Sequence, residues 1–143
     1  MRNDIPHNRL TRGRHEVSAA SRVVASGHWA CGKKVERLEK KLSLVASKKY
    51  AVAVSSGLSA IRLALLALDI KKGDGVILPA YSCVALANAI LSVGAKPLPA
   101  DVLPGEWNIN PSSVEKQRRS KNHIKAVIAV HTFGFPARLE ELK

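Results

Sequence analysis

The sequence predicts an α/β domain with a mainly parallel sheet flanked by helices, and three observations support this. A chain of 143 residues with 46% apolar residues suits one ordinary domain with a hydrophobic core. Short apolar segments bounded by glycine and proline alternate with segments of helical periodicity between Tyr50 and Val130. No internal repeat or low-complexity linker interrupts this alternation. Strands that alternate with helices are usually joined by right-handed crossovers and lie parallel in one sheet.

The N-terminal region precedes these alternating segments. Residues 1–25 have little apolar periodicity and are interpreted as an N-terminal arm or a short helix. The segment Lys33–Lys49 is expected to form an amphipathic helix, because apolar residues recur in it at helical spacing: Val35, Leu38, Leu42 and Val45.

The first strand, helix and strand are predicted at the centre of the sequence. Tyr50–Val54 is almost continuously apolar and predicts a buried strand. Leu58–Leu68 is apolar on nearly all sides and predicts a helix packed between the sheet and another layer. Lys71–Gly75 predicts a turn, and Val76–Leu78 predicts the next strand, which Pro79 closes.

The same pattern then repeats. Helical spacing over Cys83–Ser92 predicts a helix, and Lys96–Ala100 predicts a short strand. Pro97 and Pro99 indicate an edge strand or an irregular one, because proline donates no hydrogen bond to a neighbouring strand. Asp101–Asn110 is expected to be a loop.

One more helix and one more strand complete the expected order. Pro111 suits the first position of a helix over Ser112–Arg119, because a missing N–H costs nothing there. The apolar run Ala126–Val130 predicts another buried strand, which ends at the motif HTFGFP. His131 in this motif is expected to be a hydrogen-bonded structural histidine, with a place at a cofactor crevice as the alternative.

The formal charge of +12 suits three kinds of partner: nucleic acid, an anionic membrane surface or anionic small molecules. The basic residues gather in the N-terminal arm, in Lys33–Lys49 and in Gln117–Lys125. The amphipathic pattern favours solvated faces, or faces covered by other protein, over nucleic-acid binding. Gln117–Lys125 also lacks the interleaved aromatic residues of a single-strand binder. No apolar run is long enough to span a membrane.

The cysteines and tryptophans carry little chemical signal by themselves. Cys31 and Cys83 are far apart and fit no metal-binding or redox spacing, so no metal site is predicted. The N-terminus lacks the apolar core of a secretory signal, and two free thiols then suggest the cytoplasm. Taken alone, Cys83 fits a small buried residue, and Trp29 and Trp107 fit packing residues.

The segment Ser55–Ser59 carries the main chemical signal. Small residues at the start of a helix leave backbone N–H groups pointing outward, where the helix dipole favours an anion. Gly57 lets a ligand approach the backbone, and the neighbouring serines offer hydroxyl groups. A plain helix cap is the alternative, because serine and glycine are common at that position. The Walker, dinucleotide-binding and nucleophile-elbow motifs are absent.

A series of landmarks keeps one order along the chain from Ser26 onward. They are Ser26, Gly27, Trp29, Gly32, Ser56, Gly57, Ser59, Ala60, Gly73, Asp74, Pro79, Ala80, Gly94, Ala95, Pro97, Asp101, Trp107, Asn108, His131, Gly134, Pro136 and Ala137. Each motif is loose, but the ordered set resembles the DegT/DnrJ/StrS-type aminotransferase family over nearly the whole of this stretch.

The resemblance implies fold type I, the aspartate-aminotransferase-like architecture, in a homodimer that uses pyridoxal 5′-phosphate (PLP). Most members transfer an amino group, typically from glutamate, to a keto group on a nucleotide-linked sugar, in polysaccharide or secondary-metabolite biosynthesis. Gly57, Leu58 and Ser59 match the loop whose amides hold the PLP phosphate, with Leu58 in place of the usual threonine. Cys83 matches a position where members commonly carry an aromatic ring stacked on the pyridine, so weaker cofactor contact is expected.

The resemblance also places two catalytic groups downstream of the HTFGFPA segment: the Schiff-base lysine and the acid that pairs with the pyridinium nitrogen. Lys121, Lys125 and Lys143 match no lysine motif of the family, so no catalytic residue is assigned. Residues 26–143 are therefore expected to be a partial large domain with an incomplete sheet, truncated before the lysine and the small domain and inactive alone.

Such a fragment is expected to self-associate or to pair with a missing second half, because its sheet edge and the apolar helix Leu58–Leu68 lack partners. Two alternatives have no catalytic role. One is an interaction fragment that docks on a full-length homologue, and the other is a basic nucleic-acid-binding module.

Overall fold

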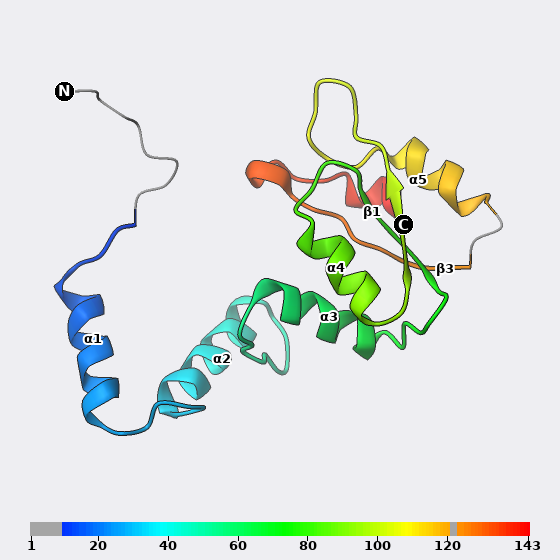
Figure 1. The fold of residues 1–143 in the computed structure, drawn as a ribbon. Helices are drawn as coiled ribbons and strands as arrows, with labels where there is room; N and C mark the ends of the chain where they lie inside the picture. The colour runs from blue at the N-terminus through cyan, green and yellow to red at the C-terminus, as the bar shows by residue number, and fades with distance from the viewer. Residues whose placement is uncertain (1–9, 121–122) are drawn as a thin grey trace, which may run out of the picture. The chain divides into compact units, whose positions relative to one another are not determined.

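A computed structural model describes residues 10–120 and 123–143 of the chain. The chain divides into two compact units, unit 1 over Met1–Ala53 and unit 2 over Val54–Lys143 (Figure 1). Each unit is described by itself. The expected arm, residues 1–25, lies outside the described residues in its first nine positions, and a helix follows in the rest.

Unit 1 contains two helices, α1 over Arg14–Ala25 and α2 over Lys33–Val45, and neither helix buries a residue. At the start of α1, the backbone N–H of Gly13 donates to a carboxylate oxygen of Glu16 at 2.6 Å. The predicted helix Lys33–Lys49 exists but ends earlier. Ser47 has a φ of +50°, in the left-handed region, which no α-helix continues through.

The prediction of a buried strand over Tyr50–Val54 is wrong. The structure has no strand here, and Tyr50 and Val52 are 74% and 75% exposed. The backbone N–H of Ala53 donates to the Glu39 side chain at 2.8 Å instead of to another strand. A continuous apolar run becomes a strand only where a neighbour accepts its backbone hydrogen bonds, and no described segment pairs with this one.

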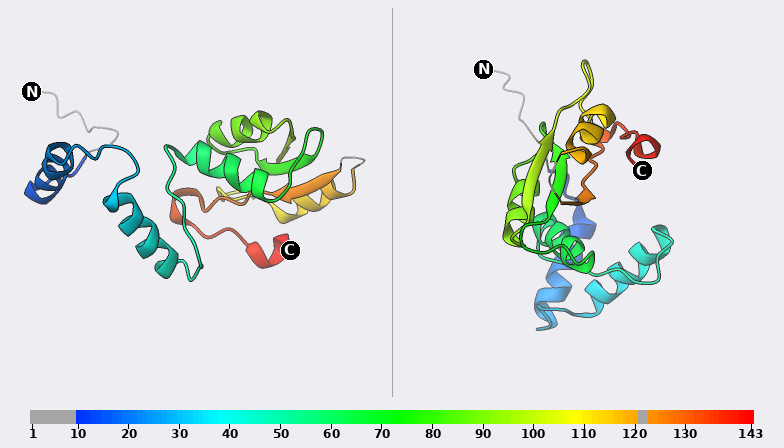
Figure 2. Two further views of the ribbon diagram at one scale, coloured as in Figure 1. Left: turned by 90° about the horizontal axis from the view of Figure 1, so that it is seen from below. Right: turned by 90° about the vertical axis from the view of Figure 1, so that its right-hand side faces the viewer.

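Unit 2 is built on a three-stranded sheet with helices on its faces (Figures 1 and 2). The strands follow the order β2-β1-β3, and both pairings are parallel. The elements are α3 (Gly57–Ala67), β1 (Gly75–Pro79), α4 (Ala85–Ser92), β2 (Lys96–Ala100), α5 (Pro111–Arg118), β3 (Ile124–Val127), the 3-10 turn η1 (Thr132–Gly134) and α6 (Leu139–Leu142). The predicted α/β class with a parallel sheet is confirmed.

The two outer strands differ in how well the sequence predicts them. Lys96–Ala100 is the edge strand β2, as its prolines indicate. The strand predicted at Ala126–Val130 lies earlier, at Ile124–Val127. Ile128 still donates to the carbonyl of Ile77 at 2.8 Å, but the next donor in a parallel ladder would be Pro79, which has no N–H. The ladder between β1 and β3 therefore stops there.

The core of unit 2 lies on both faces of β1. On one face Val76 and Leu78 join residues of α3, of α4 and of the connections that follow these helices in a cluster: Leu65, Ile70, Leu86, Ile90 and Ala95. On the other face Ile77 packs with Ala100, Ile109 and Val114. All five residues of β1 are buried, as expected for the central strand of a sheet covered on both faces.

The helix α3 confirms the predicted helix over Leu58–Leu68, but the described residues supply no second layer over it. Leu65 is buried against the sheet, whereas Leu63 and Leu66 are each 48% exposed and Leu68 is 65% exposed. An apolar face of this helix therefore has no cover within the described structure. Within the same described residues, no helix combines the length and the hydropathy needed to cross a membrane.

Candidate functional site

The segment Ser55–Ser59 forms the start of α3, and its serine hydroxyls contact one another. Ser56 is the residue before the helix, in an extended conformation, and its Oγ accepts from the backbone N–H of Ser59 at 3.1 Å. The Ser59 hydroxyl lies 3.0 Å from the Ser56 hydroxyl and 3.4 Å from the Ser55 hydroxyl. The helix cap considered as an alternative from the sequence is therefore present.

The same turn also has the features of an anion site. Among the described residues, none accepts a hydrogen bond from the backbone N–H of Gly57 or of Leu58. A Cβ placed on Gly57 would meet no atom within 4 Å, so the space in front of the helix is open. Two free N–H donors at the positive end of an eleven-residue helix, beside three hydroxyls, fit a phosphate group. Leu58 adds only its N–H, because its side chain is a hydrocarbon.

Cys83 lies elsewhere at the same end of the sheet and is exposed. The interpretation of Cys83 as a small buried residue is wrong, because the chain leaves the sheet at Pro79 and α4 begins only at Ala85. The thiol lines a depression of about 440 Å³, formed by the loop after β1 and the segment after β3. The lining residues are Tyr81, Ser82, Cys83, Val130, His131, Thr132 and Phe133.

Three aromatic rings form an aromatic cluster beside this depression: Tyr81, Trp107 and Phe133. The ring centroids of Tyr81 and Trp107 are 5.3 Å apart, and those of Trp107 and Phe133 are 5.6 Å apart. Tyr81 and Phe133 are 6.4 Å apart. The rings are 46%, 47% and 71% exposed in sequence order, so Trp107 packs against other rings at the surface and not in a core.

The prediction that Trp29 is a packing residue is also wrong. Its side chain is 76% exposed, and its indole N–H donates to the carbonyl of Val24 at 2.9 Å. The N–H group finds its partner at the end of α1, so the ring stays in solvent.

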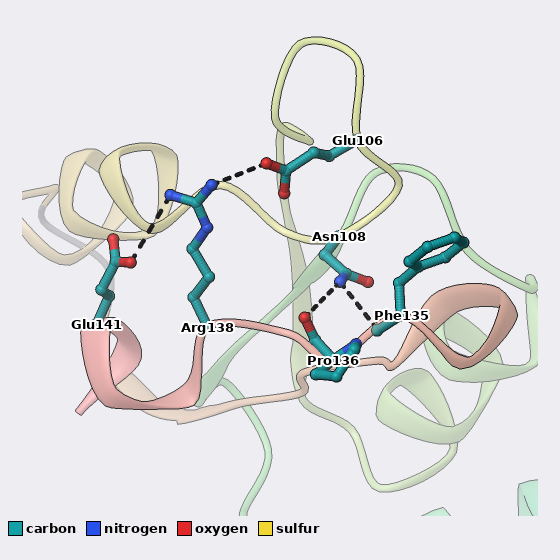
Figure 3. A network of polar contacts seen from close by, with 6 residues as sticks. All are labelled: Glu106, Asn108, Phe135, Pro136, Arg138 and Glu141. Carbon is teal, nitrogen blue, oxygen red and sulfur yellow. Dashed lines mark hydrogen bonds and ion pairs between the residues drawn. The ribbon is translucent and has the colours of Figure 1, made fainter.

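A buried amide, Asn108, holds the segment that carries Phe133 (Figure 3). Its Nδ2 donates to the carbonyls of Phe135 and Pro136 at 3.0 and 2.9 Å. Its Oδ1 accepts from the backbone N–H of Thr132 at 3.1 Å. One side chain from the loop before α5 therefore fixes three backbone groups of the segment between β3 and α6. Asn108 is one of the landmarks of the family resemblance, but nothing in the sequence assigned this role to it.

Three further contacts reinforce this segment. His131 Nδ1 accepts from the backbone N–H of Ala137 at 2.9 Å, which confirms the prediction of a hydrogen-bonded structural histidine. The Arg138 guanidinium donates to Glu106 at 2.8 Å and lies 3.7 Å from Glu141 (Figure 3). Both ion pairs are about half exposed, so each adds little to stability, and the buried amide matters more.

The three lysines that match no family motif share no site within the described residues. Lys121 lies outside the described residues, Lys125 is exposed on β3, and Lys143 pairs with Glu140 at 2.8 Å. Across residues 10–120 and 123–143, no group of three histidine, cysteine, aspartate or glutamate side chains is arranged to hold a metal ion.

Several known proteins with similar sequences and structures are aminotransferases. Bacillus subtilis 3-oxo-glucose-6-phosphate:glutamate aminotransferase is 33% identical over 127 residues, which cover 89% of this chain and 28% of that protein. The structure of Streptomyces venezuelae DesV in complex with a ketimine intermediate matches at a TM-score of 0.82 and 34% identity, over 90% of this chain and 34% of that one. NtdA from Bacillus subtilis, with bound PMP, matches at a TM-score of 0.81 and 33% identity, over 88% and 28% of the two chains.

The chain therefore spans about a third of the length of the relatives that it matches. The chain therefore matches fold type I aminotransferase structures only in part, over the third of their length that it spans. A family model also matches residues 11–143, which is nearly all of the sequence. This chain belongs to the DegT/DnrJ/EryC1/StrS aminotransferase family.

Proposed function

We propose that this chain is the part of a PLP-dependent aminotransferase that binds the phosphate of the cofactor. The amino acceptor of the complete enzyme is a keto group on a nucleotide-linked sugar, in polysaccharide or secondary-metabolite biosynthesis. One observation carries the proposal. The N–H groups of Gly57 and Leu58 are unpaired at the open start of α3, in a chain of the aminotransferase family.

The residues proposed to bind the cofactor are Gly57, Leu58, Ser59 and Cys83. Gly57 and Leu58 supply backbone donors, and Ser59 supplies a hydroxyl that already points toward Ser56. Cys83 supplies only a small contact surface to the ring. PLP, when bound, would supply an aldehyde carbon that takes up the amino group and an electron-withdrawing ring that stabilises negative charge beside it.

The chain of 143 residues is proposed to be inactive by itself. Transamination needs a lysine amine at the cofactor, and neither exposed Lys125 nor ion-paired Lys143 has an arrangement that suits this role. No catalytic residue is therefore assigned within it. The free thiols and the family support a cytoplasmic location for the protein.

A partner is proposed to cover the apolar face of α3, either a second copy of this chain or a second segment that completes the sheet. Leu63, Leu66 and Leu68 are about half exposed or more on this helix, which is unusual for a stable monomer. This exposed face also supports the second candidate function, a non-catalytic fragment that docks on a full-length homologue.

Titration with PLP, followed by borohydride reduction and peptide mapping, tests the proposal. We expect scattered, substoichiometric labelling of surface lysines together with a phosphate-competable affinity for the cofactor. One stoichiometric labelled lysine would contradict inactivity, because it would supply the missing amine.

A matched pair of variants locates the phosphate. Gly57→Asp places a negative charge at the start of α3, where it favours the helix but repels an anion. Gly57→Asn has the same shape without the charge. We expect Gly57→Asp to abolish competition by phosphate and Gly57→Asn to retain most of it. An affinity for phosphate that is unchanged from the unaltered chain in both variants would show that the phosphate binds elsewhere.

A further inference from the structure

The aromatic cluster of Tyr81, Trp107 and Phe133 has a feature that packing alone does not require. All three rings remain about half exposed or more, although their centroids lie within 6.4 Å of one another. Aromatic side chains that pack only for stability lose most of their exposed area, because burial of that area is what stabilises the fold. The cluster therefore presents ring surface for a further contact.

The cluster shares its depression with Cys83. Tyr81, Cys83 and Phe133 all line the same concave surface, which lies beyond the carboxyl ends of β1 and β3. Ligands of open α/β sheets bind at this edge. Figures 1 and 2 show the start of α3 and the orange segment that contains η1 at the same end of unit 2. A ligand with a phosphate and a flat ring matches these two features.

Phe133 is held in a strained conformation by its surroundings. Its φ of +54° and ψ of +22° lie in the left-handed region, where a bulky side chain is a genuine outlier. The turn persists because Asn108 binds the backbone of Thr132 on one side and of Phe135 on the other, and because His131 accepts from Ala137. Strain that the surroundings enforce in this way is typical of functional sites.

A buried oxygen on the same lining lacks a partner. The hydroxyl oxygen of Thr132 is inaccessible to solvent and makes no hydrogen bond within the described part of the chain. Buried hydroxyls are almost always paired, so this oxygen is a second unusual feature of the segment that carries Phe133. It lies one residue before Phe133 and belongs to the depression.

We propose that Tyr81 and Phe133, supported by Trp107, pack against the pyridine ring of the cofactor and replace the ring that Cys83 does not provide. This inference rests on the proposed function, because it takes the cofactor as the ligand. It assigns the aromatic contact to the segments after β1 and β3 instead of to residue 83.

Binding of pyridoxine 5′-phosphate to the full chain tests this assignment. This probe has the ring and the phosphate of the cofactor but no aldehyde, so it forms no covalent bond with surface lysines. Trp29→Phe leaves Trp107 as the single tryptophan of the chain, and its fluorescence then reports on the cluster. We expect the probe to quench this fluorescence and inorganic phosphate to displace it.

A set of variants distinguishes contact between an aromatic ring and the probe from an effect of side-chain bulk and from a general loss of packing. Phe133→Ala, Phe133→Leu and Tyr81→Ala are each expected to weaken probe binding by roughly 3- to 10-fold, because an aromatic contact is lost. Phe135→Ala removes an exposed ring that lies outside the cluster and is expected to bind the probe normally. Cys83→Phe in the Phe133→Ala background is expected to restore most of the affinity.

Two results would overturn the inference, and they differ in their meaning for the proposed function. If the probe binds and phosphate displaces it, but Phe133→Leu and Tyr81→Ala bind like Phe135→Ala, the rings do not contact the cofactor and the phosphate site stands. If neither the probe nor phosphate binds the unaltered chain, the proposed function fails together with the inference.

Discussion

The two units of this chain contain helices of similar length but bury very different amounts of apolar surface. In unit 1, α1 and α2 bury no residue, although Leu38 and Leu42 recur at helical spacing. In unit 2, the shorter helix α4 buries Leu86, Ala89 and Ile90 against the sheet. Helical periodicity is present in both units. The difference shows that a periodic apolar pattern predicts a helix, whereas burial depends on what the rest of the fold places opposite it.

The difference also locates the stability of the chain. The burial of apolar area is the main favourable term in folding, and the fully buried residues belong to unit 2 within the described chain. Unit 1 depends on local helix contacts and has little core of its own. Substitutions of the same kind should therefore have large effects in unit 2 and small effects in unit 1.

The largest expected effect is in the central strand. Ile77→Ala removes a side chain with no exposed surface and should lower the free energy of unfolding by about 2–5 kcal/mol. Leu44→Ala on α2, where the side chain is 72% exposed, should change it by less than about 0.5 kcal/mol. Urea unfolding followed by circular dichroism measures both. Equal losses would show that unit 1 has a core after all.

A smaller loss is expected at the buried amide of unit 2. Asn108→Ala leaves the backbone groups of Thr132, Phe135 and Pro136 without their partner and should cost about 2–3 kcal/mol in urea unfolding. Trp107 fluorescence should also shift, because the segment carrying Phe133 loses its anchor.

Asn88→Ala is the matched control for this substitution. Asn88 is exposed in the middle of α4, where alanine is the better helix former, so no loss of stability is expected. A loss at Asn88 as large as that at Asn108 would mean that the amide network is not what stabilises this segment.

The sequence predicts the structure well at positions where one residue type determines the conformation of its own stretch of backbone. Pro111 is the first residue of α5, Asn110 caps that helix through its side chain, and Pro97 and Pro99 lie on the edge strand. Proline and cap residues act through their own backbone, so no knowledge of the distant chain is needed.

The positions that the sequence misses depend on distant contacts. Tyr50–Val54 has the composition of a buried strand, but pairing decides its structure and no described strand pairs with it. The contacts of Asn108 span 24 to 28 residues, and the rings of the aromatic cluster come from three separate loops. The free donors at Gly57 and Leu58 were predicted, because a helix start is a local feature. The residues that surround Cys83 come partly from the segment after β3, so they could be identified only from the fold.

A moderate effect is expected at the start of α3. Ser56→Ala removes the acceptor for the Ser59 N–H and should cost about 1 kcal/mol, whereas Ser55→Ala, outside the cap, should cost much less. Saturating phosphate should reduce the Ser56→Ala loss, because an anion at this helix start can accept a hydrogen bond from the Ser59 N–H that the variant leaves unpaired. Thermal unfolding with and without phosphate measures this. An unchanged loss would indicate that no anion binds there.

The smallest expected effect is the pH response of α1 in unit 1. Hydrogen bonds from its own backbone N–H and from that of Gly13 lower the pKa of Glu16 below the ordinary glutamate value. A lowered pKa means that the folded helix favours the carboxylate. The stabilising contribution of the Glu16 carboxylate to α1 is therefore complete above the ordinary glutamate pKa, and it is lost as the pH falls through the lowered pKa.

The amide resonance of Gly13 should report this titration in NMR spectra, and Glu16→Gln should abolish it. Because Glu16 belongs to unit 1, urea unfolding of unit 2 should not follow the same curve, and a shared curve would mean that the two units fold as one.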